Sequence, residues 1–372
     1  MELLNATKML AGYTMGMAPD GRESLVVVVK GTFRFPDKPD QEPVLAEEQV
    51  PLVMADTFEG EPGFSPPVYE SEFAPKKLKC DVLLNGSAYA PDGRPTKRVT
   101  VSLQVGDWRK SFVVVGNRTW KKGWFGVSST RPEAFTSMPI SYGKAFGGTD
   151  TSQENPQKHK FVLVNPVGRG FHHYLSGKLI NAKPLPNTEE EGRSVRKPDG
   201  EYRPMAFGAI GRNWDPRYKL AGTYDQNWID NIFPFLPPDF QAAYYQAAPV
   251  DQQIPHLRVG ETVTLTNLTP EGTTRFAIPT VEMPIVFFSK KGEKQETQGV
   301  IDTIIIEPDH RRFMLIWRQS YPLKRNMFDV VQVVAGVMPR GWYRARELGK
   351  TYYPSLGALV VAKLRERAEA EA

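Results

Sequence analysis

Apolar and polar residues alternate along several short segments in the first third of the chain. The clearest segment is 98–105, whose apolar members are Val99, Val101, Leu103 and Val105. Strict alternation over this length is typical of a β-strand with one buried face. Residues 106–107 predict a turn into a second strand at 110–116, so we expect an antiparallel hairpin with those four side chains turned inward. β-Branched runs predict further strands at residues 24–30, 32–35 and 81–89.

The last third of the chain has the same character. Short apolar or alternating segments, separated by Pro, Gly and polar residues, predict strands at residues 262–268, 275–279, 284–288, 300–307 and 312–318. The last two should be antiparallel neighbours joined by a turn at residues 308–309. Only two segments predict helices: residues 238–248, and residues 355–372 with a charged tail.

The stretch from residue 138 to residue 260 has little apolar periodicity. It is rich in Pro, Gly, Trp and Tyr, which argues against both regular secondary structure and disorder. The sequence therefore predicts a mainly β protein, with antiparallel sheets in a sandwich-like scaffold built from both ends of the chain. We expect an N-terminal β region at 1–137, a loop-rich aromatic block at 138–260, a C-terminal β region at 261–345, and a helical tail at 346–372.

Composition narrows the functional class. The 372 residues carry a net charge of +5, and the basic residues form only short clusters, which argues against nucleic-acid binding. Cys80 is the single cysteine, so no intramolecular disulfide can form, as suits a reducing compartment. We see no signal peptide and no apolar run of about 18 residues, and so expect a cytoplasmic protein that does not enter a membrane.

Candidate catalytic chemistry is sparse. The five histidines lack the ligand spacing of a zinc site, and Cys80 has no nucleophile signature around it. The glycines at 143–148 lack the motif of a phosphate-binding loop. We therefore expect no enzyme activity, no metal and no cofactor.

Paired carboxylates are the strongest argument for an enzyme. Acidic residues stand among aromatic ones in the middle block, as in glycoside hydrolases, where two carboxyl groups flank a sugar that stacks on aromatic rings. These residues are Asp215, Asp225, Asp230 and Asp239. The alternative function is therefore a carbohydrate-binding or glycoside-hydrolase-like protein. Turn and helix-cap roles explain the same aspartates more simply.

Protein binding is the function that the middle block favours. Trp, Tyr and Arg dominate the energetics of protein–protein interfaces, and loops on a rigid scaffold commonly carry such surfaces. The predicted partner-binding residues are Tyr142, Phe146, Trp214, Arg217, Tyr224 and Trp228.

An ordered series of short motifs resembles a bacterial family of unknown-function domains encoded beside type VI secretion spike and effector genes. The motifs are KGTF at 30–33, KCDVLLNG at 79–86, MPISY at 138–142, AFGG at 145–148, NPVGRG at 165–170, LPN at 185–187, WDPR at 214–217, GTYD at 222–225 and LPPDF at 236–240. The resemblance covers residues 5–286. It departs from the family pattern at Cys80, where a polar or small residue is expected.

The resemblance implies a non-enzymatic adaptor or chaperone. Such a protein binds a secreted effector in the cytoplasm and helps to load it onto the secretion spike, a trimeric valine–glycine-repeat protein that in some systems carries a Pro-Ala-Ala-Arg-repeat tip. It supplies no catalytic residue to transfer, and it does not identify the effector.

Overall fold

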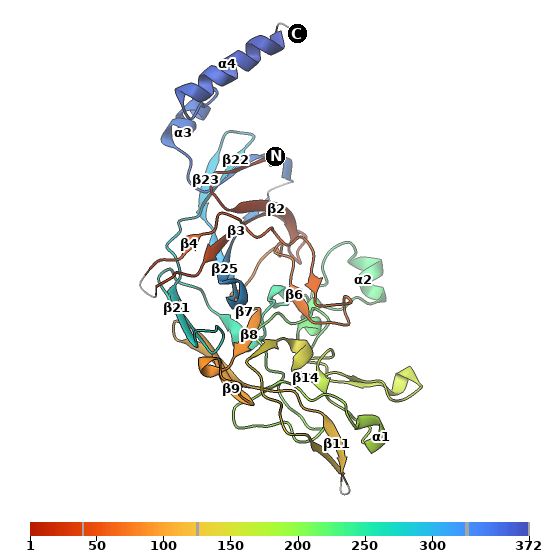
Figure 1. Ribbon diagram of the computed structural model, residues 1–372. Helices are drawn as coiled ribbons and strands as arrows, with labels where there is room; N and C mark the ends of the chain where they lie inside the picture. The colour runs from red at the N-terminus through yellow and green to blue at the C-terminus, as the bar shows by residue number, and fades with distance from the viewer. Residues whose placement is uncertain (39–40, 124–125, 324–326, 371–372) are drawn as a thin grey trace.

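The largest sheet combines strands from both ends of the chain (Figure 1). The structure is a computed structural model that describes residues 1–38, 41–123, 126–323 and 327–370. Across the sheet the strands are β19 (Gln253–Ile254), β7 (Cys80–Leu84), β24 (Val300–Glu307), β25 (Arg312–Pro322), β3 (Glu23–Arg34) and β2 (Leu10–Met17), with β4 (Val44–Leu45) paired to the end of β3. Only β7 and β24 run parallel among these pairs.

A second sheet contains the predicted hairpin. Its order is β18 (Thr188–Glu189), β10 (Trp108–Val115), β9 (Arg98–Val105), β20 (Thr262–Thr266) and β21 (Thr273–Ala277). In the hairpin Val105 is opposite Trp108, and the four apolar side chains of β9 are all buried, which confirms the predicted register. A third sheet has the order β1 (Glu2–Asn5), β26 (Val330–Ala335), β22 (Pro284–Ser289) and β23 (Lys294–Gln298).

Aromatic stacking joins the first two sheets. Phe276 of β21 stacks on Phe313 of β25 with 4.6 Å between ring centroids, and Phe35 stacks on Phe276 at 4.8 Å. All three rings are buried in one large cluster with side chains of β3, β7, β9, β10 and β24. The prediction of a mainly β scaffold with antiparallel sheets is therefore confirmed.

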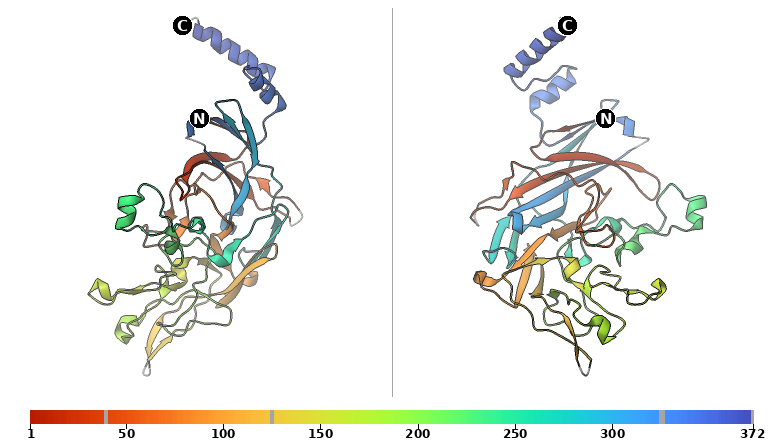
Figure 2. Two further views of the ribbon diagram at one scale, coloured as in Figure 1. Left: turned by 180° about the vertical axis from the view of Figure 1, so that it is seen from behind. Right: turned by 45° about the vertical axis from the view of Figure 1, so that its right-hand side comes forward.

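The middle block lies at the end of the scaffold opposite the C-terminal helix (Figure 2). In and around it, short pairs replace long sheets: β5 (Thr57–Phe58) with β6 (Pro67–Tyr69), β8 (Gly86–Tyr89) with β13 (Ser137–Ile140), β11 (Trp120–Gly123) with β12 (Gly126–Ser129), β14 (Phe146–Gly147) with β17 (Arg169–Gly170), and β15 (Thr149–Asp150) with β16 (Lys160–Phe161). The described α-helices are α1 (Gly177–Ile180), α2 (Gln226–Asn231), α3 (Arg340–Glu347) and α4 (Leu356–Ala370).

Side chains bonded to backbone groups fix the irregular segments. The Asn165 amide donates hydrogen bonds to the carbonyls of Tyr142 (2.9 Å) and Phe146 (3.0 Å). Gly147, at φ 149°, passes so close to this segment that an added Cβ would lie 2.2 Å from the Asn165 carbonyl oxygen. The AFGG and NPVGRG motifs therefore pack directly against each other, and Gly147 allows the two backbones to come this close.

One predicted helix is correct and one is wrong. The helix predicted from residue 355 onward is present as α4 (Leu356–Ala370), and its predicted end at 371–372 lies outside the described residues. Residues 238–248, in contrast, form only a 3₁₀ turn at Ala242–Tyr245. In this segment the Tyr244 carbonyl accepts from the Arg217 guanidinium, and the Asp239 carboxylate, which could have capped a helix, accepts from the Thr223 amide. Helix α3 was not predicted.

Candidate protein-binding surface

Four of the six predicted partner-binding residues lie in the interior. Tyr142, Phe146, Trp214 and Arg217 each expose 3% of their surface or less. The Tyr142 ring meets Trp214 edge-on at 5.4 Å, and Phe146 packs in a separate cluster with Trp120. In this structure these four side chains support the middle block from inside and are not accessible to a partner.

The side chain of Arg217 connects three other segments of the chain by hydrogen bonds and an ion pair. Its guanidinium donates to the Ile210 carbonyl (2.7 Å) and the Tyr244 carbonyl (2.9 Å), and its Nη2 pairs with Glu70 Oε1 at 2.5 Å. A planar group with several donors in a fixed fork suits such a role. The WDPR motif therefore holds the block together.

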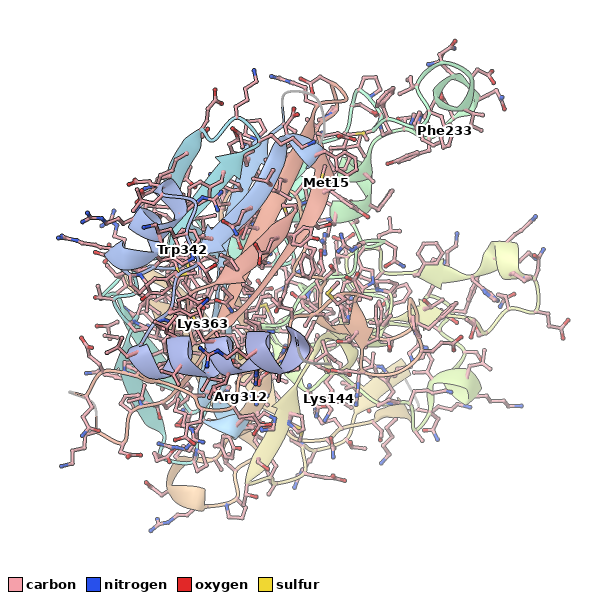
Figure 3. The ribbon with its side chains drawn as sticks, turned by 90° about the horizontal axis from the view of Figure 1, so that it is seen from above. Met15, Lys144, Phe233, Arg312, Trp342 and Lys363 are labelled. Atoms are coloured by element: carbon pink, nitrogen blue, oxygen red, sulfur yellow. The ribbon has the colours of Figure 1, made fainter. Side chains whose placement is uncertain are left out.

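The other two residues, Tyr224 and Trp228, belong to a protruding segment at residues 222–240, here called the aromatic loop. It carries α2 and projects from the body, with Phe233 near its outer end (Figure 3). Four of its large apolar side chains expose between 44% and 66% of their surface: Tyr224, Ile229, Phe233 and Phe235. Exposed apolar side chains gathered on one element mark candidate interaction sites.

Internal contacts hold the aromatic loop in shape. The Asp225 carboxylate caps α2 by accepting from the Trp228 amide (2.9 Å), and the Trp228 indole donates to the Phe235 carbonyl (2.9 Å). Tyr224 and Phe233 both meet the Trp228 ring edge-on, at 4.8 and 5.5 Å. The loop is thus built around Trp228 before any partner arrives, which lowers the entropic cost of binding.

The aspartates of the middle block have partners within the chain. At the base of the loop, Asp239 accepts from the Thr223 amide (2.9 Å) and hydroxyl (2.7 Å). Asp230 accepts from Gln226 (2.9 Å), and Asp215 pairs with Lys219 (2.9 Å). With Asp225 as a helix cap, each of the four carboxylates is bonded within the chain, as the turn and cap interpretation of these residues expects.

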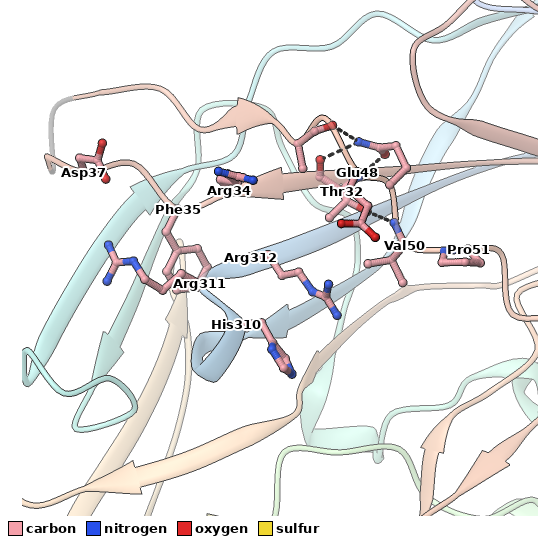
Figure 4. Close-up of a pocket in the computed structure, with 12 residues that line it drawn as sticks. Thr32, Arg34, Phe35, Asp37, Glu48, Val50, Pro51, His310, Arg311 and Arg312 are labelled. Carbon is pink, nitrogen blue, oxygen red and sulfur yellow. Dashed lines mark hydrogen bonds between the residues drawn. The ribbon is translucent and has the colours of Figure 1, made fainter.

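A cavity of about 470 Å³ opens beside the end of β3 (Figure 4). Two of the arginines that line the cavity form ion pairs with carboxylates: Arg311 pairs with Glu271 (2.8 Å) and Arg312 with Glu307 (2.6 Å). Arg34 faces a space that Glu48 and Asp37 also line. Because these charges cancel, the cavity has no excess of positive charge to hold an anion.

A second cavity, of about 520 Å³, lies beside Tyr142. Its most unusual lining group is Lys110, which is buried and bonds to Gln252 Oε1 (2.6 Å) and the Asp251 carboxylate (3.1 Å). Burial lowers the pKa of Lys110 to about 8. The remaining walls are mainly Tyr, Pro, Val and Ile side chains.

Within the described ranges, no group of three or more His, Cys, Asp or Glu residues is placed to hold a metal ion. The Cys80 thiol is buried, and burial raises its pKa well above the usual value, which suppresses the reactive thiolate. None of the helices in the described part of the chain has the length and apolar character to cross a membrane.

Sequence reasoning missed the buried charges of the main sheet. Lys30 pairs with Glu72 (2.6 Å), Lys77 with Asp81 (2.6 Å) and Arg318 with Asp302 (2.5 Å), all almost without exposure. Arg318 also donates to the carbonyls of Glu72 and Ala74, so the network fastens this segment to the sheet. The available signal was a single charge inside an apolar run, as in VVVVK at 26–30 and VIDTIII at 300–306.

Comparison with known proteins adds one family. The model for a bacterial family described as an uncharacterized protein conserved in bacteria (DUF2169) matches residues 20–318. The chain belongs to this DUF2169 family. No curated protein and no solved structure matches the chain. The matched range contains the hairpin, the aromatic loop, and the main sheet apart from β2 and the end of β25. Strand β26 and helices α3 and α4 lie beyond it.

Proposed function

We propose that this DUF2169 protein is a non-enzymatic adaptor that binds a secreted effector through the aromatic loop. The observation that carries the proposal is the exposure of Tyr224, Ile229, Phe233 and Phe235 on a frame that is already ordered around Trp228. Aromatic side chains on a rigid element give a large contact area at a small entropic cost.

The resemblance described above supplies the biological setting of the proposal. The adaptor would act in the cytoplasm of a bacterium with a type VI secretion system. It would cover an apolar segment of the effector and carry the effector to the valine–glycine-repeat spike or to its Pro-Ala-Ala-Arg-repeat tip. An apolar segment left exposed aggregates, so covering it would also keep the effector soluble.

A paired experiment tests the surface. Phe233→Ala removes an exposed ring, and we expect at least about tenfold weaker binding to the proposed secreted effector, with nearly unchanged thermal stability. Trp214→Ala removes a buried ring and should cost about 3–5 kcal/mol of stability. Binding by the Phe233→Ala variant at wild-type affinity would refute the assignment of the loop.

Co-expression tests the chaperone role. We expect the effector to be scarce or insoluble when it is expressed alone and to be recovered with this protein, because a partner that binds the folded form stabilises it. Equal yields of soluble effector with and without this protein would argue against a chaperone role and would be compatible only with a docking role. Hydrolysis of glycans or peptidoglycan by the purified protein, abolished by Asp225→Ala or Asp239→Ala in a folded variant, would favour the glycoside-hydrolase alternative instead.

A further inference from the structure

Lys110 lines the cavity beside Tyr142 from an unexpected position on the hairpin. In β10 the residues at alternate positions, Lys110, Phe112 and Val114, all turn to the buried face. The residue opposite Lys110 on β9 is Leu103, which is also buried. Alternation therefore places a charged side chain where an apolar one would pack, and removing an ammonium group from water is costly.

The partners of the Lys110 ammonium offset only part of this cost. Its Nζ donates to Gln252 Oε1, a neutral amide oxygen, at 2.6 Å and lies 3.1 Å from the Asp251 carboxylate. That carboxylate is 37% exposed and also pairs with Arg203 at 3.2 Å. A carboxylate that is open to solvent and shared with a second cation stabilises the ammonium less than a dedicated buried one would.

The incomplete compensation favours the neutral amine, which is the nucleophilic form of lysine. Burial is the largest influence on the pKa of Lys110, which is lowered to about 8. At pH 7 an amine with this pKa is about 10% neutral, whereas an ordinary lysine is about 0.04% neutral. The other titratable side chains that line the cavity are Tyr142, Tyr202, Arg203, Asp215 and Asp251.

The cavity itself has the size and the lining of a small-molecule site. Its volume of about 520 Å³ lies within the range of about 300–1,000 Å³ that is common for ligand pockets. The charged side chains of the lining balance, with Lys110 and Arg203 against Asp215 and Asp251. An uncharged ligand with an apolar body therefore suits the cavity better than an anion. The apolar walls are Tyr142, Val164, Pro204, Ile210, Pro216 and Val250.

We propose that Lys110 forms a reversible imine with a small apolar aldehyde bound in this cavity. The neutral amine attacks the carbonyl carbon, and the resulting carbinolamine loses its oxygen as water. The C=O bond is replaced by a C=N bond, with no oxidation or reduction. When the imine is protonated, it carries the same charge as the former ammonium, so the Asp251 carboxylate keeps a cationic partner. This binding site is independent of the proposed adaptor function.

Chemical trapping of the imine tests the proposal on the full-length protein. Benzaldehyde is added with cyanoborohydride, which delivers hydride to the imine carbon and fixes the adduct as a secondary amine, and labelled peptides are quantified by mass spectrometry. At pH 7 we expect Lys110 to be labelled at least tenfold faster than Lys97, an exposed lysine outside the cavity lining. This ratio should fall toward pH 10, where ordinary exposed lysines also become neutral.

Glyoxylate, an aldehyde that carries a carboxylate, tests the predicted ligand class. We expect the preference for Lys110 over Lys97 to be at least fivefold smaller with glyoxylate than with benzaldehyde, because the cavity has apolar walls and no excess of positive charge. An equal preference with both aldehydes would refute the assignment of an apolar ligand.

A pair of variants tests the cavity without changing the amine. Val250 lines the cavity and is 67% exposed, so Val250→Trp can narrow the entrance while the fold is kept. We expect labelling of Lys110 to fall at least fivefold, with labelling of Lys97 unchanged. Val259→Trp, at an exposed valine outside the lining, is the matched control and should have no effect.

Three results would overturn the proposal. The first is labelling of Lys110 in the native protein that is no faster than labelling of Lys97. The second is an equal effect of Val250→Trp and Val259→Trp on the labelling of Lys110. The third is an adduct at Lys110 that forms only after the protein is unfolded in urea, which would show that the amine is not accessible from the cavity.

Discussion

Truncation of Asp81 should reveal how strongly the buried charges hold the fold. The Asp81 carboxylate is fully buried and accepts from Lys77 Nζ (2.6 Å), Gln246 Nε2 (2.7 Å) and the Ala247 amide (2.8 Å). These contacts attach the segment before β7 and the end of the middle block to the main sheet. Asp81→Ala would remove an acceptor from three donors, one of them charged, although Gln246 Nε2 keeps the Lys79 carbonyl at 3.1 Å.

The expected loss can be worked out from these contacts. Removing one partner of a buried ion pair costs about 3–5 kcal/mol, and each stranded donor costs about 1–3 kcal/mol. Lys77 retains the Thr303 hydroxyl at 2.9 Å and slight access to solvent, so it can relax. We therefore expect a loss of about 4 kcal/mol, which is a large part of the 5–15 kcal/mol typical of a folded domain.

Urea unfolding followed by tryptophan fluorescence measures this loss. Asp309→Ala is the matched control, because that exposed carboxylate accepts from Ser87 and Tyr89 and should cost less than about 1 kcal/mol. Adding Lys77→Met to Asp81→Ala should recover part of the stability, since the stranded charge is then removed. A loss below about 1 kcal/mol for Asp81→Ala would refute the reasoning.

Three further predictions follow from burial. Val101→Asp places an unpaired charge in the core of the hairpin and should cost at least about 4 kcal/mol, so wild-type-like melting would contradict the register. The pKa of Lys110 is lowered to about 8, so the folded protein loses this proton first. The stability of wild type relative to Lys110→Met should therefore rise from about pH 8 toward pH 10, and a flat difference in urea midpoints would refute it. Cys80 should react with a disulfide reagent only after unfolding; rapid labelling of native protein would place it at the surface.

The regular strands could be predicted because their pattern is local. In β9 and β10, alternation determines which face is buried, and the turn at Gly106 determines the register. The C-terminal strands β24 and β25 followed from the same rule. The sequence does not show that β7 pairs in parallel with β24, because this pairing joins residues more than two hundred positions apart.

The candidate site was harder to predict because composition does not distinguish a buried ring from an exposed one. Trp214 and Trp228 both stand among Pro, Asp and Tyr, yet Trp214 packs beneath Tyr142 whereas Trp228 supports a protruding loop. Arg217 was predicted as an interface residue but bonds to buried carbonyls. Deciding between these roles requires the long-range contacts that only the folded chain provides.

Most of the motifs behind the family resemblance act as internal supports. Lys30, Asp81, Asn165 and Arg217 all bond to buried groups of neighbouring segments. The rings of Phe233 and Phe235 on the aromatic loop are largely exposed instead. We therefore expect a change at Phe233 to leave the fold nearly intact, whereas a change at Asp81 disturbs the fold first. Under the proposed adaptor function, this separation would let one frame present different binding side chains to different partners.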